Sequence, residues 1–243
     1  MGAGLLFGHM QLDLLRQSLS DFFRDLQAGW RSGLEPLYET VAAWQAHWPP
    51  PTPAALPATL DAALTNSQTR AFYQGHAYYP KEALLQLAET APEMVNLAFG
   101  RLFREGEDLG DRFAAFTHYL DEVLGEVRRV HPRTKFNTHH HDDYRAPSLY
   151  CACRHPATHA YFEADVYLGA LRALRAKDVG TVADPTRFAK TVKVIMTFAR
   201  KEAACAKTQD ARRDPTSPIY LGAGAYLEPS ALLASEYFRY VSR

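Results

Sequence analysis

Residues 185–206 read PTRFAKTVKVIMTFARKEAACA, and this stretch sets the expected fold class. At 100° per residue, its apolar side chains fall on one face of a helix and its basic side chains on the other. Asp184 precedes Pro185 and is suited to cap the first turn. The pattern predicts an amphipathic helix from Pro185 to about Ala206. Its apolar face holds Phe188, Val192, Ile195, Met196 and Ala199, and its basic face holds Arg187, Lys190, Lys193, Arg200, Lys201 and Lys207.

The same helical spacing recurs along the chain, so we expect a mainly α fold with at most one or two short strands near 159–163. Residues 1–48 are expected to form an N-terminal helical hairpin. Residues 49–57, PPPTPAALP, are dense in proline, which stops helices and favours an extended linker. Residues 58–243 then form the expected main helical domain. Its predicted helices lie near 80–90, 92–104, 108–130, 147–154 and 229–240.

Length and composition indicate a globular protein of the reducing cytoplasm. The 243 residues can bury a core, and 47% are hydrophobic and 22% charged. No apolar run approaches the roughly 18 residues of a membrane helix, and no basic segment followed by an apolar one marks secretion. Three cysteines are too few for a disulfide framework. We therefore expect no membrane partner.

Charge is distributed unevenly although the net charge is zero. Residues 1–126 hold 8 basic and 16 acidic residues, whereas residues 127–213 hold 17 basic and 8 acidic residues. The two parts could attract each other within the fold, or the basic part could meet an anion such as nucleic acid. The basic face of 185–206 has the same two interpretations, a solvated surface or an anion-binding one.

A second polar stretch, HHHDDYRAPSLYCAC at 139–153, raises the question of a metal site. Structural zinc sites space their cysteines two to four residues apart, whereas Cys151 and Cys153 are separated by one residue. On a helix the two thiols point about 200° apart, so the spacing favours a short buried helix without zinc. The alternative is a metal site of His139, His141 and Asp143, which would serve a hydrolase or nuclease.

The residues between the histidines and this helix have a structural interpretation. Asp142 and Asp143, with His141 and Arg145, are expected to organise the helix entry through capping and an ion pair. The chain has no phosphate-binding loop, no nucleophile elbow and no H-E-x-x-H motif. We therefore assign no catalytic residue and expect no cofactor.

The stretch from 135 to 171 resembles the N-terminal regions of McrB-like AAA+ proteins, and the resemblance covers most of 80–243 but not 1–57. The closing YLEPSALLASEYFRYV also fits. Tyr144 is inserted in the motif, cysteines replace large aliphatic residues, and no AAA+ module follows. The matching residues are Asn137, His141, Asp142, Asp143, Arg145, Ser148, Leu149, Tyr150, Arg154, Pro156, Tyr161, Phe162 and Tyr167.

The resemblance implies bacterial defence, in which such modules select a target, often nucleic acid, for a GTPase motor and a nuclease partner. The leading hypothesis is therefore a non-catalytic recognition module that binds DNA or an anionic partner, with an AAA+ motor or nuclease subunit as a further partner. The metal-dependent enzyme and a protein–protein adaptor remain alternatives. The expected nucleic-acid-binding residues are Arg187, Lys190, Lys193, Arg200, Lys201 and Arg145.

Overall fold

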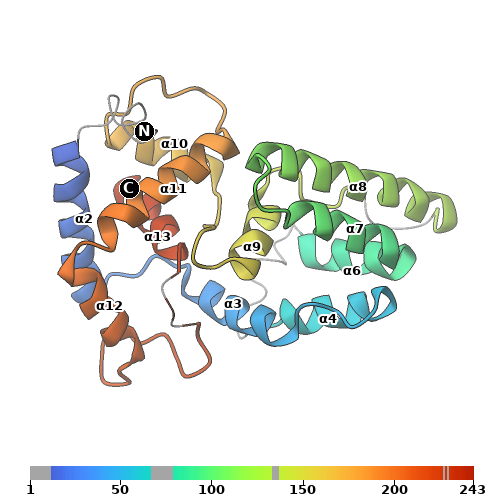
Figure 1. Ribbon diagram of the computed structural model, residues 1–243, viewed down its shortest axis with the longest axis horizontal. Coiled ribbons are helices and arrows are strands. Elements are labelled where there is room, and N and C mark those ends of the chain that lie inside the picture. Colours follow the sequence, from blue (N-terminus) through green and yellow to red (C-terminus); the bar gives the residue numbers. More distant parts are fainter. Residues whose placement is uncertain (1–11, 67–78, 133–136, 227, 229) are drawn as a thin grey trace. The chain divides into compact units, whose positions relative to one another are not determined.

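A computed structural model describes residues 12–66, 79–132, 137–226, 228 and 230–243, and helices dominate these residues (Figure 1). No strand occurs in the described ranges, and residues 159–163 have no regular secondary structure. The mainly α prediction is therefore confirmed. The helices are α2 (Leu12–Gln27), α3 (Glu35–His47), η1 (Pro53–Ala55), α4 (Leu56–Ala63), α6 (Pro80–Thr90), α7 (Pro92–Leu102), α8 (Leu109–Val130), α9 (Arg145–Arg154), α10 (Ala164–Ala173), α11 (Pro185–Ala199), α12 (Ala203–Arg213) and α13 (Leu232–Val241).

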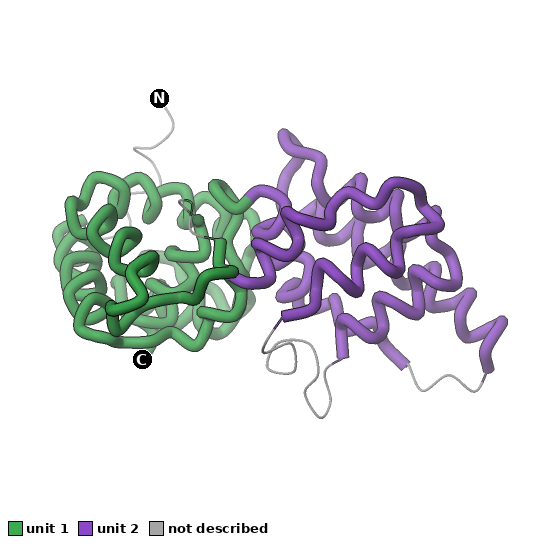
Figure 2. The backbone as a smooth tube through the Cα atoms, turned by 90° about the horizontal axis from the view of Figure 1, so that it is seen from below, with its two compact units in different colours: residues 1–38, 156–243 green, residues 39–155 purple. Residues whose placement is uncertain are grey.

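The chain divides into two compact units (Figure 2). Unit 1 comprises Met1–Tyr38 and Pro156–Arg243, and unit 2 comprises Glu39–His155. This division differs from the one expected at 49–57, because one boundary falls within α3 and the other directly after α9. The prolines of 49–57 introduce η1 and α4 instead of an extended linker, since the first helical turn does not need the N–H group that proline lacks.

Unit 1 is organised around α13, which contacts α2, α10 and α11, while α2 also packs on α12. Seven consecutive residues of α13, from Leu232 to Phe238, are buried. A helix buried on all sides needs an apolar surface all round or internal partners for its polar groups. Glu236 is the charged member of this run, and it has such partners.

Unit 2 is a bundle in which α7 packs along α8, with α6, α4 and α9 beside them. Large aromatic side chains fill its interior, and each meets several others at ring distances typical of stacked or edge-to-face pairs. Trp44, for example, stacks on Tyr150 with ring centroids 5.7 Å apart. The cluster comprises Trp44, Trp48, Phe99, Phe103, Phe116 and Tyr150.

The helix expected from Pro185 to Ala206 is in fact two helices, which corrects the prediction. α11 ends at Ala199, and the backbone N–H groups of Lys201 and Glu202 bond the carbonyls of Phe198 and Ala199 in a tightened last turn. Glu202 is then extended, with φ −77° and ψ 123°, and α12 starts in a new direction. Beyond this break, α12 packs on α2.

Among the described residues, every helix is too short or too polar to cross a bilayer.

Candidate functional site

The basic surface of unit 1 is built by α11. Asp184 caps the helix by accepting a 2.8 Å hydrogen bond from the backbone N–H of Thr186, and Pro185 occupies the first turn, as the sequence predicts. Phe188, Val192 and Ile195 are buried, and α11 packs on α13. Because the apolar face is held in the core, the side chains on the opposite face are directed outward.

Two lysines of this face, Lys190 and Lys193, are exposed, and neither forms a salt bridge within the described part of the chain. No acidic residue occurs between Asp184 and Glu202 in the sequence. A carboxylate on the same helix, three or four residues away, is the usual partner of an exposed lysine. The α11 surface therefore presents cations to solvent without neighbouring anions on its own helix.

The other predicted cations are partly engaged. Arg187 is half-buried and donates to the carbonyls of Asp178 and Lys177 at 2.6 and 2.8 Å. Arg200 and Lys201 lie beyond the end of α11 rather than on it.

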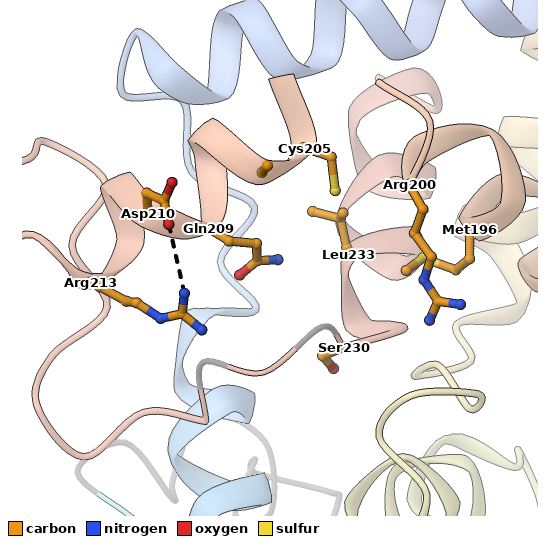
Figure 3. A pocket seen from close by; sticks show the side chains of 9 residues that line it. Met196, Arg200, Cys205, Gln209, Asp210, Arg213, Ser230 and Leu233 are labelled. Carbon is orange, nitrogen blue, oxygen red and sulfur yellow. Dashed lines mark ion pairs between the residues drawn. The ribbon is translucent and has the colours of Figure 1, made fainter. Parts of the chain in front are cut away.

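Arg200 is exposed and donates from Nη2 to the carbonyl of Ala157 at 2.9 Å. It also lines a pocket of about 310 Å³ between α11, α12 and α13 (Figure 3). Lys201 has its Nζ 5.9 Å from the centre of the Phe198 ring, within reach of a cation–π contact. Of the predicted basic face, Lys190 and Lys193 remain exposed on α11 without a salt bridge to any described residue, and Arg200 and Lys201 are exposed in the turn that follows.

Arg145 was expected to belong with these cations, but it lies in unit 2. It pairs there with Asp143, whose Oδ2 is 2.6 Å from both Arg145 Nη2 and Arg145 Nε. The Oδ1 of Asp143 also accepts from the backbone N–H of Arg145 at 3.0 Å, at the first residue of α9. Asp143 therefore holds the start of α9, and the guanidinium of Arg145 has a carboxylate partner.

The histidines of the 139–145 segment bond to each other and to the core of unit 2. His139 and His141 are buried, at 1% and 0% exposure. The Nδ1 of His139 accepts from the backbone N–H of His141 at 3.1 Å, so Nδ1 is unprotonated and Nε2 carries the proton. His139 Nε2 then donates to Asp121 at 3.2 Å. This fixes one tautomer for His139.

His141 takes the opposite tautomer. Its Nδ1 donates to the carbonyl of His139, and its Nε2 lies 3.0 Å from the hydroxyl of Tyr150, which donates to it. Burial holds the pKa of His141 well below its ordinary value, so the ring is neutral near pH 7. Both ring nitrogens are thereby used within the fold.

The alternative metal set of His139, His141 and Asp143 is not assembled as a set of ligands, because each side chain has another partner. One other group within the described ranges has ligand atoms within 4.8 Å of one another: Asp121, His139 and Asp142. Binding an ion at His139 Nε2 would require moving its proton to Nδ1, which faces the N–H of His141. The tautomer of His139 with a protonated Nε2 therefore disfavours metal binding by Asp121, His139 and Asp142.

The cysteines of α9 are buried, at 1% exposure for Cys151 and 0% for Cys153, in the short helix that their spacing predicts. Burial raises the pKa of Cys151 to about 12 and that of Cys153 in the same direction. Both are neutral thiols near pH 7, whereas zinc binds the thiolate. Cys153 acts as a small apolar residue of the core, whereas the thiol of Cys151 also accepts from Arg112 Nη2 at 3.6 Å.

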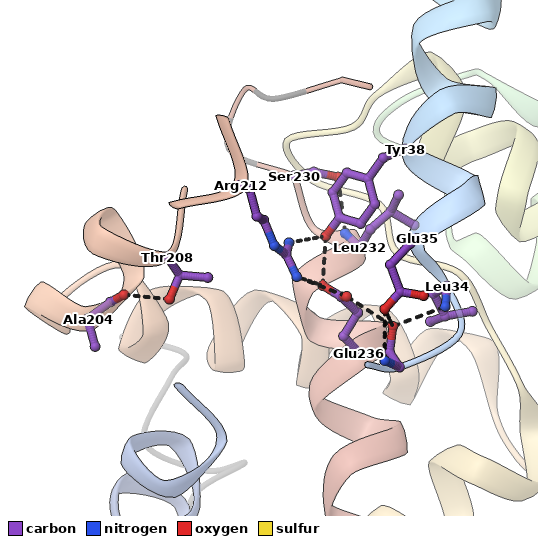
Figure 4. Close-up of polar contacts among 10 residues, drawn as sticks. Leu34, Glu35, Tyr38, Ala204, Thr208, Arg212, Ser230, Leu232 and Glu236 are labelled. Carbon is purple, nitrogen blue, oxygen red and sulfur yellow. Dashed lines mark hydrogen bonds and ion pairs between the residues drawn. The ribbon is translucent and has the colours of Figure 1, made fainter. Parts of the chain in front are cut away.

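Sequence reasoning missed the buried ion pair of unit 1, in which Arg212 of α12 meets Glu236 of α13 at 2.7 Å (Figure 4). The Nη1 of Arg212 donates to the hydroxyl of Tyr38 at 2.8 Å, and that hydroxyl donates to Glu236 at 2.8 Å. Ser32 completes the shell with a 3.0 Å bond to Glu236. The partners lie up to 204 residues apart in sequence, so no local pattern marks them.

Comparison of the chain with family models, with curated proteins and with solved structures gave no match.

Proposed function

We propose that the protein is a non-catalytic recognition module that binds DNA, or another anionic partner, through the exposed cations of α11 and the following turn. The observation that supports this most is the pair Lys190 and Lys193, exposed on a helix whose whole sequence lacks an acidic residue. Lysine side chains on such a surface neutralise phosphates and release counterions without reading bases. Arg200 and Lys201 extend the cationic surface past the helix end.

This surface accounts for affinity but not for sequence selection. A surface with four exposed cations neutralises only a few phosphates, so binding should be weak and strongly salt-dependent. In keeping with the resemblance to McrB-like proteins, catalysis belongs to a partner, an AAA+ motor or a nuclease subunit, and this chain supplies binding to the target.

The test is fluorescence anisotropy with a labelled duplex of about 20 base pairs at low salt, near 50 mM. The variant is Lys190→Gln/Lys193→Gln, which removes two charges from the α11 surface. The control is Arg101→Gln/Arg104→Gln, which removes two charges from exposed or half-buried positions in unit 2. We expect the α11 variant to bind several-fold to tenfold more weakly and the control to bind like the unmodified protein.

Two outcomes contradict the proposal. Equal weakening by both double variants would show that net charge, and not the α11 surface, determines binding. No binding at low salt by the unmodified protein would remove DNA as the ligand and leave the adaptor function as the better account.

A metal-dependent hydrolase or nuclease is the second candidate, and the group of Asp121, His139 and Asp142 is the observation in its favour. Carboxylate and imidazole side chains are suitable ligands for a divalent ion. The fixed tautomer of His139 stands against it. Elemental analysis of the purified protein distinguishes the two candidates, since this enzyme would hold about one metal per chain and lose it in the variant Asp121→Asn.

A further inference from the structure

We propose that unit 1 has a second binding site, the pocket between α11, α12 and α13, and that it takes a small monocarboxylate with an apolar body. The pocket has a volume of about 310 Å³, at the lower end of the range for ligand sites, and gaps between packed helices are a common place for such sites. Its lining divides into an apolar part and a polar part. It comprises Met196, Arg200, Cys205, Ala206, Gln209, Asp210, Arg213, Ser230 and Leu233.

The apolar part of the lining comes from three helices. Met196 of α11 and Leu233 of α13 are nearly buried, at 5% and 2% exposure, and α12 contributes Cys205 and Ala206. Figure 3 shows the side chains of Cys205 and Leu233 pointing toward the space between α12 and α13. Such a surface favours an apolar ligand body, because burying it removes hydrocarbon from water on both sides.

The polar part selects a single negative charge. Arg200 and Arg213 lie on opposite sides of the pocket in Figure 3, and Asp210 is 3.7 Å from Arg213. Counted by side chain, the lining holds two guanidinium groups and one carboxylate, a net charge of +1. Arg200 uses Nη2 to bond Ala157, and a guanidinium has five N–H donors in a geometry that suits a carboxylate.

A neutral polar group completes the lining. Gln209 is half-buried, and its amide has no hydrogen bond with any described residue. It lies between Arg213 and Leu233 in Figure 3, where it can donate to a ligand oxygen that the arginines do not reach. An amide with both a donor and an acceptor discriminates by geometry rather than by charge.

The pocket walls are held in place by the buried ion pair. Arg212 immediately precedes Arg213 on α12, and Glu236 lies one turn after Leu233 on α13, so their 2.7 Å contact joins the two walls (Figure 4). On its other side α12 is bonded to α2, since Gln27 donates to Thr208 and to the carbonyl of Ala204. Walls fixed in this way reduce the ordering cost of binding.

Cys205 provides a reporter inside the pocket. It is partly exposed, whereas Cys151 and Cys153 are buried. Burial raises the pKa of the Cys205 thiol, so alkylation by iodoacetamide is slow near neutral pH and is best followed near about pH 8.5. Mass spectrometry of the intact protein then shows whether one alkyl group has been added, and peptide mapping assigns that group to Cys205.

The experiment compares protection of Cys205 by 4-phenylbutyrate with protection by its neutral amide, 4-phenylbutanamide. We expect the carboxylate to protect at concentrations about tenfold lower than the amide, as one charge-assisted pair contributes about this factor. Arg200→Gln and Arg213→Gln should each abolish that difference. Lys207→Gln, an exposed charge on α12 outside the lining, should preserve it.

Protection by neither compound at millimolar concentration would overturn the proposal, and so would equal protection by both. Retention of the tenfold difference in both arginine variants would show that the carboxylate binds elsewhere. Arg200 belongs to both the α11 surface and the pocket, but the DNA test changes only Lys190 and Lys193, which do not line the pocket, so the two results can be distinguished. The protein can fail either test and pass the other.

Discussion

The histidine segment of unit 2, 139–145, and the α11 surface of unit 1 are both rich in ionisable residues, but they use them in opposite ways. In the histidine segment, His139 and His141 are buried and each ring nitrogen has a partner inside the fold. On α11, Lys190 and Lys193 are exposed and have no carboxylate partner on their helix. Polar groups with internal partners stabilise a fold, whereas charges left facing solvent remain available to a ligand.

The largest expected effect is on stability, at His141. Replacing His141 with Ala removes a buried ring and leaves the hydroxyl of Tyr150 and the carbonyl of His139 without their partner. The free energy of unfolding should fall by roughly 2–4 kcal/mol. Urea unfolding measures it, with His118→Ala as control, since His118 is an exposed histidine of α8 and its loss should change stability by less than about 0.5 kcal/mol. Similar losses for both variants would contradict the structural role of His141.

The next effect concerns pH. Burial lowers the pKa of His141 in the folded state, while the unfolded ring titrates near about 6.5. Below that pH the unfolded state binds a proton that the folded state does not. The stabilisation due to neutral His141 is therefore fully present above about pH 6.5 and is lost as the pH falls toward the pKa of His141 in the folded state.

The slope due to this one proton reaches about 1.4 kcal/mol per pH unit. His141→Gln keeps a polar side chain but cannot titrate, so its unfolding free energy should fall less steeply between about pH 6.5 and pH 5. His155, whose pKa burial also lowers, is not among the charges that act on His141, so its contribution cancels in the difference, whereas a protonated His140 lowers the pKa of His141 further. Identical slopes in the two proteins would contradict burial of a neutral His141.

Local and distant interactions explain which features the sequence could predict. Asp184 with Pro185, and the prolines at the starts of α6 and α7, are signals within one helical turn, so these helix starts agree with the structure. The break after Ala199 and the Arg212–Glu236 pair depend on partners in other helices. The tautomers of His139 and His141 depend on hydrogen bonds that composition does not specify.

Replacing Asp143 should lower the free energy of unfolding more than replacing its neighbour Asp142, although by less than replacing His141. Asp143 accepts from the first N–H of α9 and pairs with Arg145, whereas the shortest ion contact of Asp142 is 3.9 Å from His139. Loss of this hydrogen bond and ion pair in Asp143→Ala should lower the free energy of unfolding by about 1 kcal/mol. Asp142→Ala makes the same change in charge and should cost less than about 0.5 kcal/mol. If the two variants melted alike, Asp143 would not organise the helix entry.

No change at all is expected from zinc. Because His139 Nε2 carries a proton and Cys151 and Cys153 are buried neutral thiols, zinc has no prepared ligand set in the 139–153 segment. Added zinc should leave the melting temperature unchanged, and the purified protein should hold no stoichiometric metal. A rise in melting temperature that disappears in Asp121→Asn would contradict this account and favour the enzyme.

The salt dependence of DNA binding tests the central claim most directly. The association constant of a labelled duplex is measured at several salt concentrations from about 50 to about 200 mM, for the unmodified protein and for Lys190→Gln/Lys193→Gln. If each lysine neutralises one phosphate, the log–log slope of the double variant should be shallower by about 1.8, with an unchanged melting temperature. Equal slopes, or no binding by the unmodified protein at the lowest salt, would contradict the claim that the α11 surface binds nucleic acid.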